Sequence, residues 1–103
     1  MIRRMILAAA LLGAAPTAYA ADAAVSISNF TFSPQVLTVP AGTRVVWTNR
    51  DDTVHLVAGT PPATLRSPPL DTGDHYGFLF ATRGTYRYFC ALHPMMTGTI
   101  VVK

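Results

Sequence analysis

A single cysteine, Cys90, stands among the 103 residues of this sequence, so no disulfide can form within the chain. The sequence also lacks a long apolar pattern with a period of 3.6 residues, an internal repeat, and any run of basic residues after position 20. These absences argue against a disulfide-stabilised scaffold, a helical bundle and a repeat protein. The length leaves room for one compact domain and excludes a large multidomain enzyme.

The first 20 residues hold much of the apolar content that makes the whole sequence 50% hydrophobic. Two arginines precede an apolar run over residues 5–15, and a small-x-small pattern follows at residues 18–20. This order predicts a secretory signal peptide over residues 1–20, a mature domain over residues 21–103 and a periplasmic location. The apolar run is shorter than the roughly 20 residues of a membrane-crossing helix, so we expect no membrane span in the mature protein.

Charge gives no sign of a nucleic-acid partner. The formal net charge of +3 falls to +1 without the first 20 residues, because Arg3 and Arg4 belong to that segment. A nearly neutral domain without a basic patch in its sequence is a poor candidate for binding nucleic acid.

Short segments rich in Val, Ile, Thr, Phe and Tyr recur between proline and glycine residues. They predict an all-β fold, a Greek-key β-sandwich of about seven to eight strands. We expect strands at residues 24–32, 35–39, 43–48, 55–57, 76–80, 85–90 and 99–103, and a surface loop between residues 57 and 70. Alternate strand residues predict the core: Val25, Ile27, Val45, Trp47, Phe78, Phe80, Tyr86, Tyr88, Ile100 and Val102.

Side chains that bind metals gather at the junction of two expected strands, between residues 88 and 98. Cys90, His93 and two adjacent methionines, Met95 and Met96, lie within seven residues of one another. A tight loop there can turn the thiol, the imidazole and one thioether toward a common point. His55 precedes Cys90 by 35 residues, and loops at one end of a sandwich converge, so we expect it to join them.

Two imidazoles, one thiolate and one weakly bound thioether are the ligand set of an electron-transfer copper site. Zinc, the alternative metal, binds Cys and His but gains little from methionine. A catalytic pair of Cys90 and His93 is also conceivable, but the sequence shows no oxyanion site, and its histidines suffice for one metal site only. His75 falls outside the pattern and is expected on the surface of a strand. We therefore expect no enzyme activity.

The sequence resembles the small bacterial cupredoxins, blue copper proteins that include the amicyanin, plastocyanin and pseudoazurin groups. The resemblance rests on an upstream Trp-x-Asn and histidine, at Trp47, Asn49 and His55, and on the run Cys-x-x-His-Pro-x-Met-x-Gly that begins at Cys90. It covers almost all of residues 21–103, and it implies one type 1 copper ion with the ligands His55, Cys90, His93 and Met96.

Two positions depart from the pattern of that family. In better-known relatives an asparagine follows the first histidine ligand, and its side chain bonds a serine or threonine beside the cysteine. Leu56 and Ala91 occupy these positions here, so both halves of that link are absent. We expect the backbone N–H that follows His55 to donate to the Cys90 thiolate instead.

The resemblance implies a monomeric carrier that shuttles single electrons between redox partner proteins. The exposed apolar residues around His93 suit transient docking, so we expect partners to bind near His93, Pro94 and Met95. A copper-binding or delivery protein is the alternative, because the extra Met95 and the missing side-chain link could ease the release of copper.

Overall fold

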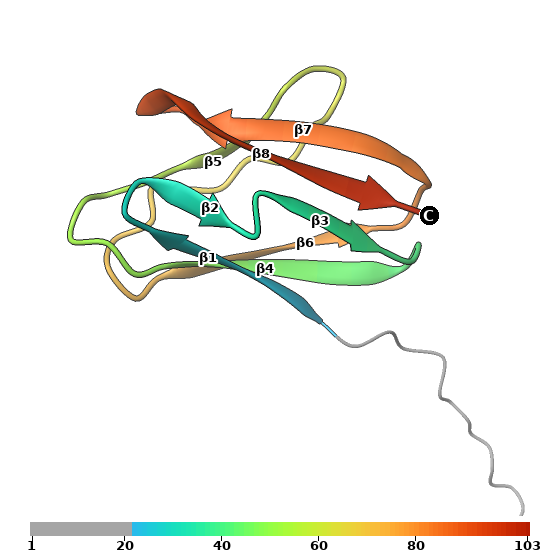
Figure 1. The fold of residues 1–103 in the computed structure, drawn as a ribbon, viewed down its shortest axis with the longest axis horizontal. Coiled ribbons are helices and arrows are strands. Elements are labelled where there is room, and N and C mark those ends of the chain that lie inside the picture. The colour runs from blue at the N-terminus through green and yellow to red at the C-terminus, as the bar shows by residue number, and fades with distance from the viewer. Residues whose placement is uncertain (1–21) are drawn as a thin grey trace, which may run out of the picture.

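Two four-stranded sheets packed face to face form the domain in the computed structural model, which describes residues 22–103 (Figure 1). The strand order is β2-β1-β4-β6 in one sheet and β3-β8-β7-β5 in the other. The strands are β1 (Ala23–Ser28), β2 (Thr31–Ser33), β3 (Val36–Val39), β4 (Thr43–Asn49), β5 (Val57–Gly59), β6 (His75–Phe80), β7 (Gly84–Cys90) and β8 (His93–Val102). The expected all-β sandwich is therefore confirmed.

One prediction from the sequence concerns residues that the structure does not describe. The expected signal peptide, residues 1–20, is outside the part of the chain that the structure describes. None of the described residues forms a helix that is long and apolar enough to cross a membrane.

The expected strand over residues 24–32 is in fact two strands, because the chain turns at Asn29 and Phe30. Both residues have a left-handed φ, 54° and 55°, and they join Ser28 of β1 to its partner Thr31 of β2. Two-residue hairpin turns with two positive φ angles favour Asn-Gly. A phenylalanine at the second position costs roughly 1–2 kcal/mol of backbone strain. The turn therefore lacks the dipeptide by which such turns are recognised.

The strands around the expected metal site also differ from the prediction. The expected strand 55–57 forms as β5, two residues later, and the last strand begins at His93 rather than at residue 99. Cys90 at the end of β7 lies opposite His93 at the start of β8, next to an irregularity in the register. The expected tight loop is thus a two-residue connection between paired strands, which fixes both of its ends.

The core lies between the two sheets and consists mainly of alternate strand residues, as the period of two predicts. Most of the expected core residues are buried: Val25, Ile27, Val45, Trp47, Phe80, Tyr88, Ile100 and Val102. Phe78 and Tyr86 are partly buried and pack against them. The segment between β5 and β6, which we expected at the surface, contributes the buried Leu65 and Leu70. That segment is therefore anchored in the core.

Tyr88 and Gly98, which are paired across β7 and β8, pack unusually closely. A Cβ atom at Gly98 would overlap Cζ of the Tyr88 ring. The Tyr88 ring also packs edge-on against Phe32 and Trp47, with centroid distances of 4.7 and 5.3 Å. Burial raises the pKa of Tyr88 to about 12, so its hydroxyl stays neutral. The ring has no room to move away from a side chain at position 98.

We expect Gly98→Ala to destabilise the metal-free protein by about 1–3 kcal/mol, the usual cost of overpacking a core. Urea denaturation measures the difference. Thr97→Ala, at the exposed neighbouring position, is the matched control and is expected to change the stability by less than about 0.5 kcal/mol. Equal stabilities of the two variants would contradict the close packing of Tyr88 on Gly98.

Candidate metal centre

Three of the expected metal-binding residues meet at one end of the sandwich, where β7 ends and β8 begins (left in Figure 1). The Nδ1 atoms of His55 and His93 each lie 3.6 Å from Sγ of Cys90. The three ligand atoms all lie within 4.8 Å of one another. His55 and Cys90 are fully buried, whereas His93 is half-buried. This group could hold one metal ion with a single imidazole close to the surface.

The two methionines of β8 lie on opposite faces of the strand. Met96 is 6% exposed and belongs to the core, whereas Met95 is 95% exposed. This difference follows from the alternation of side chains along a strand. Met96 is therefore the methionine that could complete the group, and Met95 lies at the surface.

Asn49, at the end of β4, holds the loop that leads to His55. Its buried side-chain amide donates to the carbonyl oxygens of Thr53 and Leu70, at 2.9 and 2.8 Å. Its Oδ1 accepts the N–H of Asp51 at 2.9 Å. His55 and Leu70 in turn exchange two backbone hydrogen bonds, of 3.1 and 2.7 Å. The backbone of His55 is thus fixed by its pairing with Leu70, although His55 precedes β5.

Asp51 fixes the imidazole ring of His55, a role that the sequence analysis missed. Oδ2 of Asp51 lies 2.8 Å from Nε2 of His55, which leaves Nδ1 facing Cys90. The same carboxylate accepts the backbone N–H groups of Asn29 at 2.6 Å and Phe30 at 2.9 Å. A carboxylate bonded to a metal-binding imidazole sets its tautomer and orientation. The available signal was the acidic residue four positions before His55.

The hydrogen bonds to Asp51 also change its acidity. Burial alone would raise the pKa of this carboxyl group. The hydrogen bonds from the Phe30 N–H, His55 and the Asn29 N–H have the opposite effect, which is larger, so the pKa lies below the ordinary value of 3.8. A lower pKa in the folded state means that the ionised carboxylate stabilises the fold. This contribution is fully present above the ordinary pKa and is lost as the pH falls through the folded-state pKa.

We expect Asp51→Asn to destabilise the metal-free protein at neutral pH by about 1.5–3 kcal/mol, because hydrogen bonds to a charged group are lost. The deficit shrinks as the pH falls below the ordinary carboxyl pKa of 3.8 and through the lower folded-state pKa, where the wild-type carboxylate becomes protonated as well. Urea denaturation over a series of pH values from neutral to acidic measures it. Asp52→Asn, one residue further along the loop, is the control. A deficit that stays constant as the pH falls would contradict this account.

Backbone hydrogen bonds tie the His55 and Cys90 segments together. The N–H of Leu56 donates to Sγ of Cys90 at 3.4 Å, as we predicted from the sequence. The N–H of Ala91 also donates to the carbonyl oxygen of Leu56 at 3.0 Å. The main chain therefore links the two segments at the positions where the side-chain link is absent.

Phe30 is the second residue of this site that the sequence analysis missed. The residue is 48% exposed, and its ring lies edge-on to the imidazoles of His55 and His93, with centroid distances of 5.1 and 4.9 Å. The turn at residues 29–30 places it there. His75, in contrast, is exposed on β6 and takes no part in the group, as expected.

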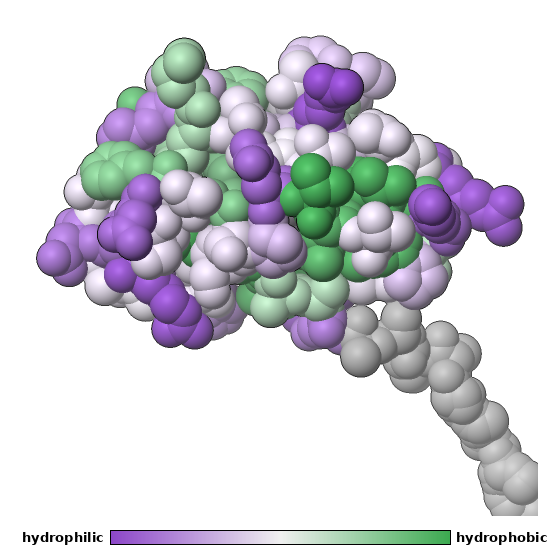
Figure 2. All heavy atoms as spheres, viewed as in Figure 1, coloured by the Kyte–Doolittle hydropathy of each residue, from purple (hydrophilic) through white to green (hydrophobic). Residues whose placement is uncertain are grey.

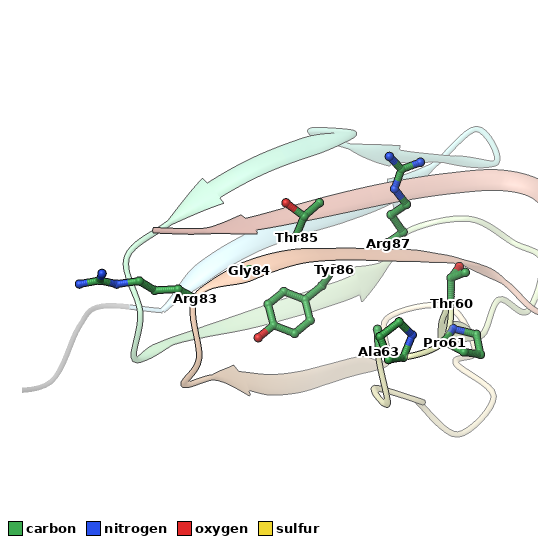
Figure 3. A pocket seen from close by; sticks show the side chains of 9 residues that line it. Thr60, Pro61, Ala63, Arg83, Gly84, Thr85, Tyr86 and Arg87 are labelled. Atoms are coloured by element: carbon green, nitrogen blue, oxygen red, sulfur yellow. The ribbon is translucent and has the colours of Figure 1, made fainter.

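One hollow on the described part of the chain lies away from the metal-binding group (Figure 3). It is a groove of about 610 Å³ between the loop after β5 and the first residues of β7. Thr60, Pro61 and Ala63 line one side, and Arg83, Thr85 and Arg87 line the other. The groove contains no paired nucleophile and base, and none of its lining residues belongs to the metal-binding group.

A thiolate and two imidazoles in one compact group, with a buried methionine on the next strand, define the class of mononuclear copper centres used for electron transfer. The chain belongs to the family of cupredoxin-like domains, whose sequence profile matches residues 3–102. The resemblance seen in the sequence is thereby confirmed.

Individual relatives support this assignment. Amicyanin from Paracoccus denitrificans is 37% identical over 83 residues, a match that covers 77% of this chain and 63% of that protein's length. Amicyanin-alpha from Methylorubrum extorquens is 34% identical over 101 residues, with coverage of 94% and 85%. Among solved structures, a purple cupredoxin from Nitrosopumilus maritimus matches with a TM-score of 0.75 and 34% identity, over 80% of this chain and all of that one.

The donor atoms fit the copper ion that this family carries. Soft sulfur ligands suit Cu(I), and imidazoles suit both oxidation states. Zinc sites of proteins rarely use a thioether, and here the single buried thiolate is accompanied by the buried Met96. One type 1 copper ion is thus the cofactor that the chemistry of the site favours.

Proposed function

We propose that this protein is a periplasmic electron carrier whose single copper ion is held by His55, Cys90, His93 and Met96. The convergence of two Nδ1 atoms on Sγ of Cys90, each at 3.6 Å, is the observation that carries the proposal. Bound copper supplies a centre that takes up and releases one electron at a time. In this proposal, residues 1–20 direct export and residues 21–103 form the functional domain.

The chain's own contribution is a site whose geometry changes little when an electron moves. Asp51 orients His55, the Leu56 N–H bonds the thiolate, and paired strands fix Cys90 opposite His93. Ligands that are held in advance keep the rearrangement between the two oxidation states small. Such rigidity suits a carrier that repeats the same transfer many times.

His93 is the proposed exit point for the electron, because its imidazole is the only one of the two that reaches the surface. Leu92 and Met95 beside it are 49% and 95% exposed. Figure 2 shows pale green, moderately hydrophobic side chains at this end of the molecule, next to strongly hydrophilic ones, whereas the deep green side chains gather toward the other end. A small apolar surface with a polar surround suits brief docking. We propose that redox partner proteins dock near His93, Pro94 and Met95, and that the carrier is a monomer.

A role as an enzyme is not part of the proposal. Four protein ligands leave no open coordination position for a substrate, which a catalytic metal needs. The groove in Figure 3 is separate from the metal-binding group and carries no catalytic pair.

The visible spectrum and the voltammogram of the copper-loaded protein test this proposal. We expect an intense thiolate-to-copper absorption band and a reversible one-electron couple. Absence of either would refute the proposal of a type 1 electron carrier.

Copper exchange with a competing chelator separates the carrier from a delivery protein. The backbone links between the Leu56 and Cys90 segments favour slow exchange in both oxidation states, and fast exchange of Cu(I) would favour delivery.

A further inference from the structure

The ring of Phe30 touches both metal-binding imidazoles. Its plane is nearly perpendicular to each of them, at 85° to His55 and 87° to His93, an arrangement that aromatic pairs favour. The two imidazoles are themselves 5.2 Å apart, so the three rings form one cluster. Phe30 therefore packs against both metal-binding imidazoles at once.

His93 has few other contacts that could orient its ring. His55 is buried and its Nε2 is bonded to Asp51. For His93, the only side-chain polar contact within residues 22–103 is that of Nδ1 with Sγ of Cys90. The orientation of the ring of His93, a residue that is only partly exposed to water, thus depends on packing, and Phe30 supplies that packing on one side.

The backbone conformation at Phe30 is unfavourable for a phenylalanine. At a φ of 55° a glycine would serve the turn better, because it has no Cβ to clash with the backbone. Residues held in such conformations concentrate at functional sites, where the surrounding structure stabilises them. The turn alone therefore does not explain why a phenylalanine occupies position 30, which points to a role for its side chain.

Asp51 stabilises this turn and connects it to the metal-binding group. Successive N–H groups of Asn29 and Phe30 converge on its carboxylate, as in the anion-binding concavities that consecutive backbone N–H groups form. Oδ2 of the same carboxylate reaches Nε2 of His55. One side chain therefore locks the Phe30 turn and the His55 ring in a common position.

We propose that Phe30 is a positioning residue that holds the His93 imidazole in its metal-binding orientation before the metal arrives, with Asp51 holding Phe30 in place. The inference rests on the proposed function, because it assumes that His93 is a ligand. A ligand that is ordered in advance costs less to immobilise on binding. Phe30 thus strengthens copper binding without contacting the copper.

Phe30→Gly and Phe30→Tyr test this inference. The glycine variant relieves the turn and removes the ring, whereas tyrosine keeps a ring in the same place. We expect Phe30→Gly to increase the mobility of the His93 ring in the metal-free protein, measured by NMR relaxation. We also expect it to weaken Cu(II) binding by about tenfold, the lower end of the effect of residues that orient metal ligands. Phe30→Tyr is expected to match the wild type in both measurements.

Leu79→Ala, at an exposed position of β6, is the control for the loss of a surface hydrophobic side chain. If Phe30→Gly and Phe30→Tyr both behave like the wild type, Phe30 does not position His93 and the inference is wrong. Should Phe30→Gly fail to fold, Phe30→Leu replaces it, with the same expectations. The mobility of His93 in the metal-free protein is measured without copper, so its outcome is independent of whether the loaded protein is blue and redox-active.

Discussion

Cys90→Ser is expected to abolish the intense visible absorption of the copper-loaded protein. The band requires a thiolate bound to Cu(II), and a hard, neutral hydroxyl cannot replace a soft thiolate. The buried sulfur also lies at the centre of the group, 3.6 Å from both imidazole Nδ1 atoms. No other described cysteine exists to take its place. The loss of colour should therefore be complete.

The same substitution should remove most of the stability that copper adds. A ligand present at a hundredfold excess over its dissociation constant stabilises the folded state by about 2.7 kcal/mol. Thermal unfolding with and without copper measures this difference, which we expect to be largely lost in Cys90→Ser. Ala91→Ser places the same hydroxymethyl group one residue further along and is the control that keeps the thiolate. A blue Cys90→Ser protein would refute the assignment of Cys90 as a copper ligand.

Most of the fold could be predicted because its main determinants are local. Alternation within short strands indicates which residues face the core, and burial of residues such as Val25, Ile27 and Ile100 follows that pattern. The turn at residues 29–30 was missed for a physical reason. Phe30 is unfavourable there, and it is held by an acceptor, Asp51, that is more than 20 positions away in the sequence. Long-range contacts of this kind leave no local pattern.

The residues of the metal-binding site also fall into those that the sequence predicts and those that it does not. Cys90, His93 and the methionines are close in the sequence, so the spacing itself predicts that they meet, and the surrounding motif brings in His55. The residues that orient these groups come from elsewhere. Phe30 belongs to the hairpin of β1 and β2, and the amide of Asn49 reaches Leu70 across 21 positions. Such orienting contacts depend on tertiary packing, which one sequence does not reveal.

The backbone link between the two ligand segments connects these observations. Leu56 and Ala91 lack polar side chains, so their main-chain groups carry the link, through the bonds from Leu56 N–H to Sγ and from Ala91 N–H to Leu56 O. Since backbone bonds do not depend on side-chain identity, the absence of both halves of the side-chain link leaves no buried amide unpaired. The geometry at Cys90 is then maintained in a less polar surrounding.

Met96→Leu is expected to keep copper bound and to raise the reduction potential, whereas Met95→Leu is expected to leave it unchanged. The axial thioether is a weak donor, and the axial ligand tunes the potential of such sites. Its removal takes a donor from the more electron-poor Cu(II) state, so the oxidised form loses more stabilisation than the reduced form. Leucine has a similar volume to methionine, which keeps the packing of the buried position.

The size of the shift follows from the relation between free energy and potential. A tenfold change in the relative stability of the two oxidation states corresponds to about 59 mV for one electron, and we expect a rise of about that size or larger. Voltammetry of both variants measures it. Met95 is 95% exposed and Met96 only 6%, so the pair differs in access to the core but not in chemistry. A shift in Met95→Leu without one in Met96→Leu would reverse the assignment of the axial ligand, and equal shifts in the two variants would contradict the assignment of Met96 as that ligand.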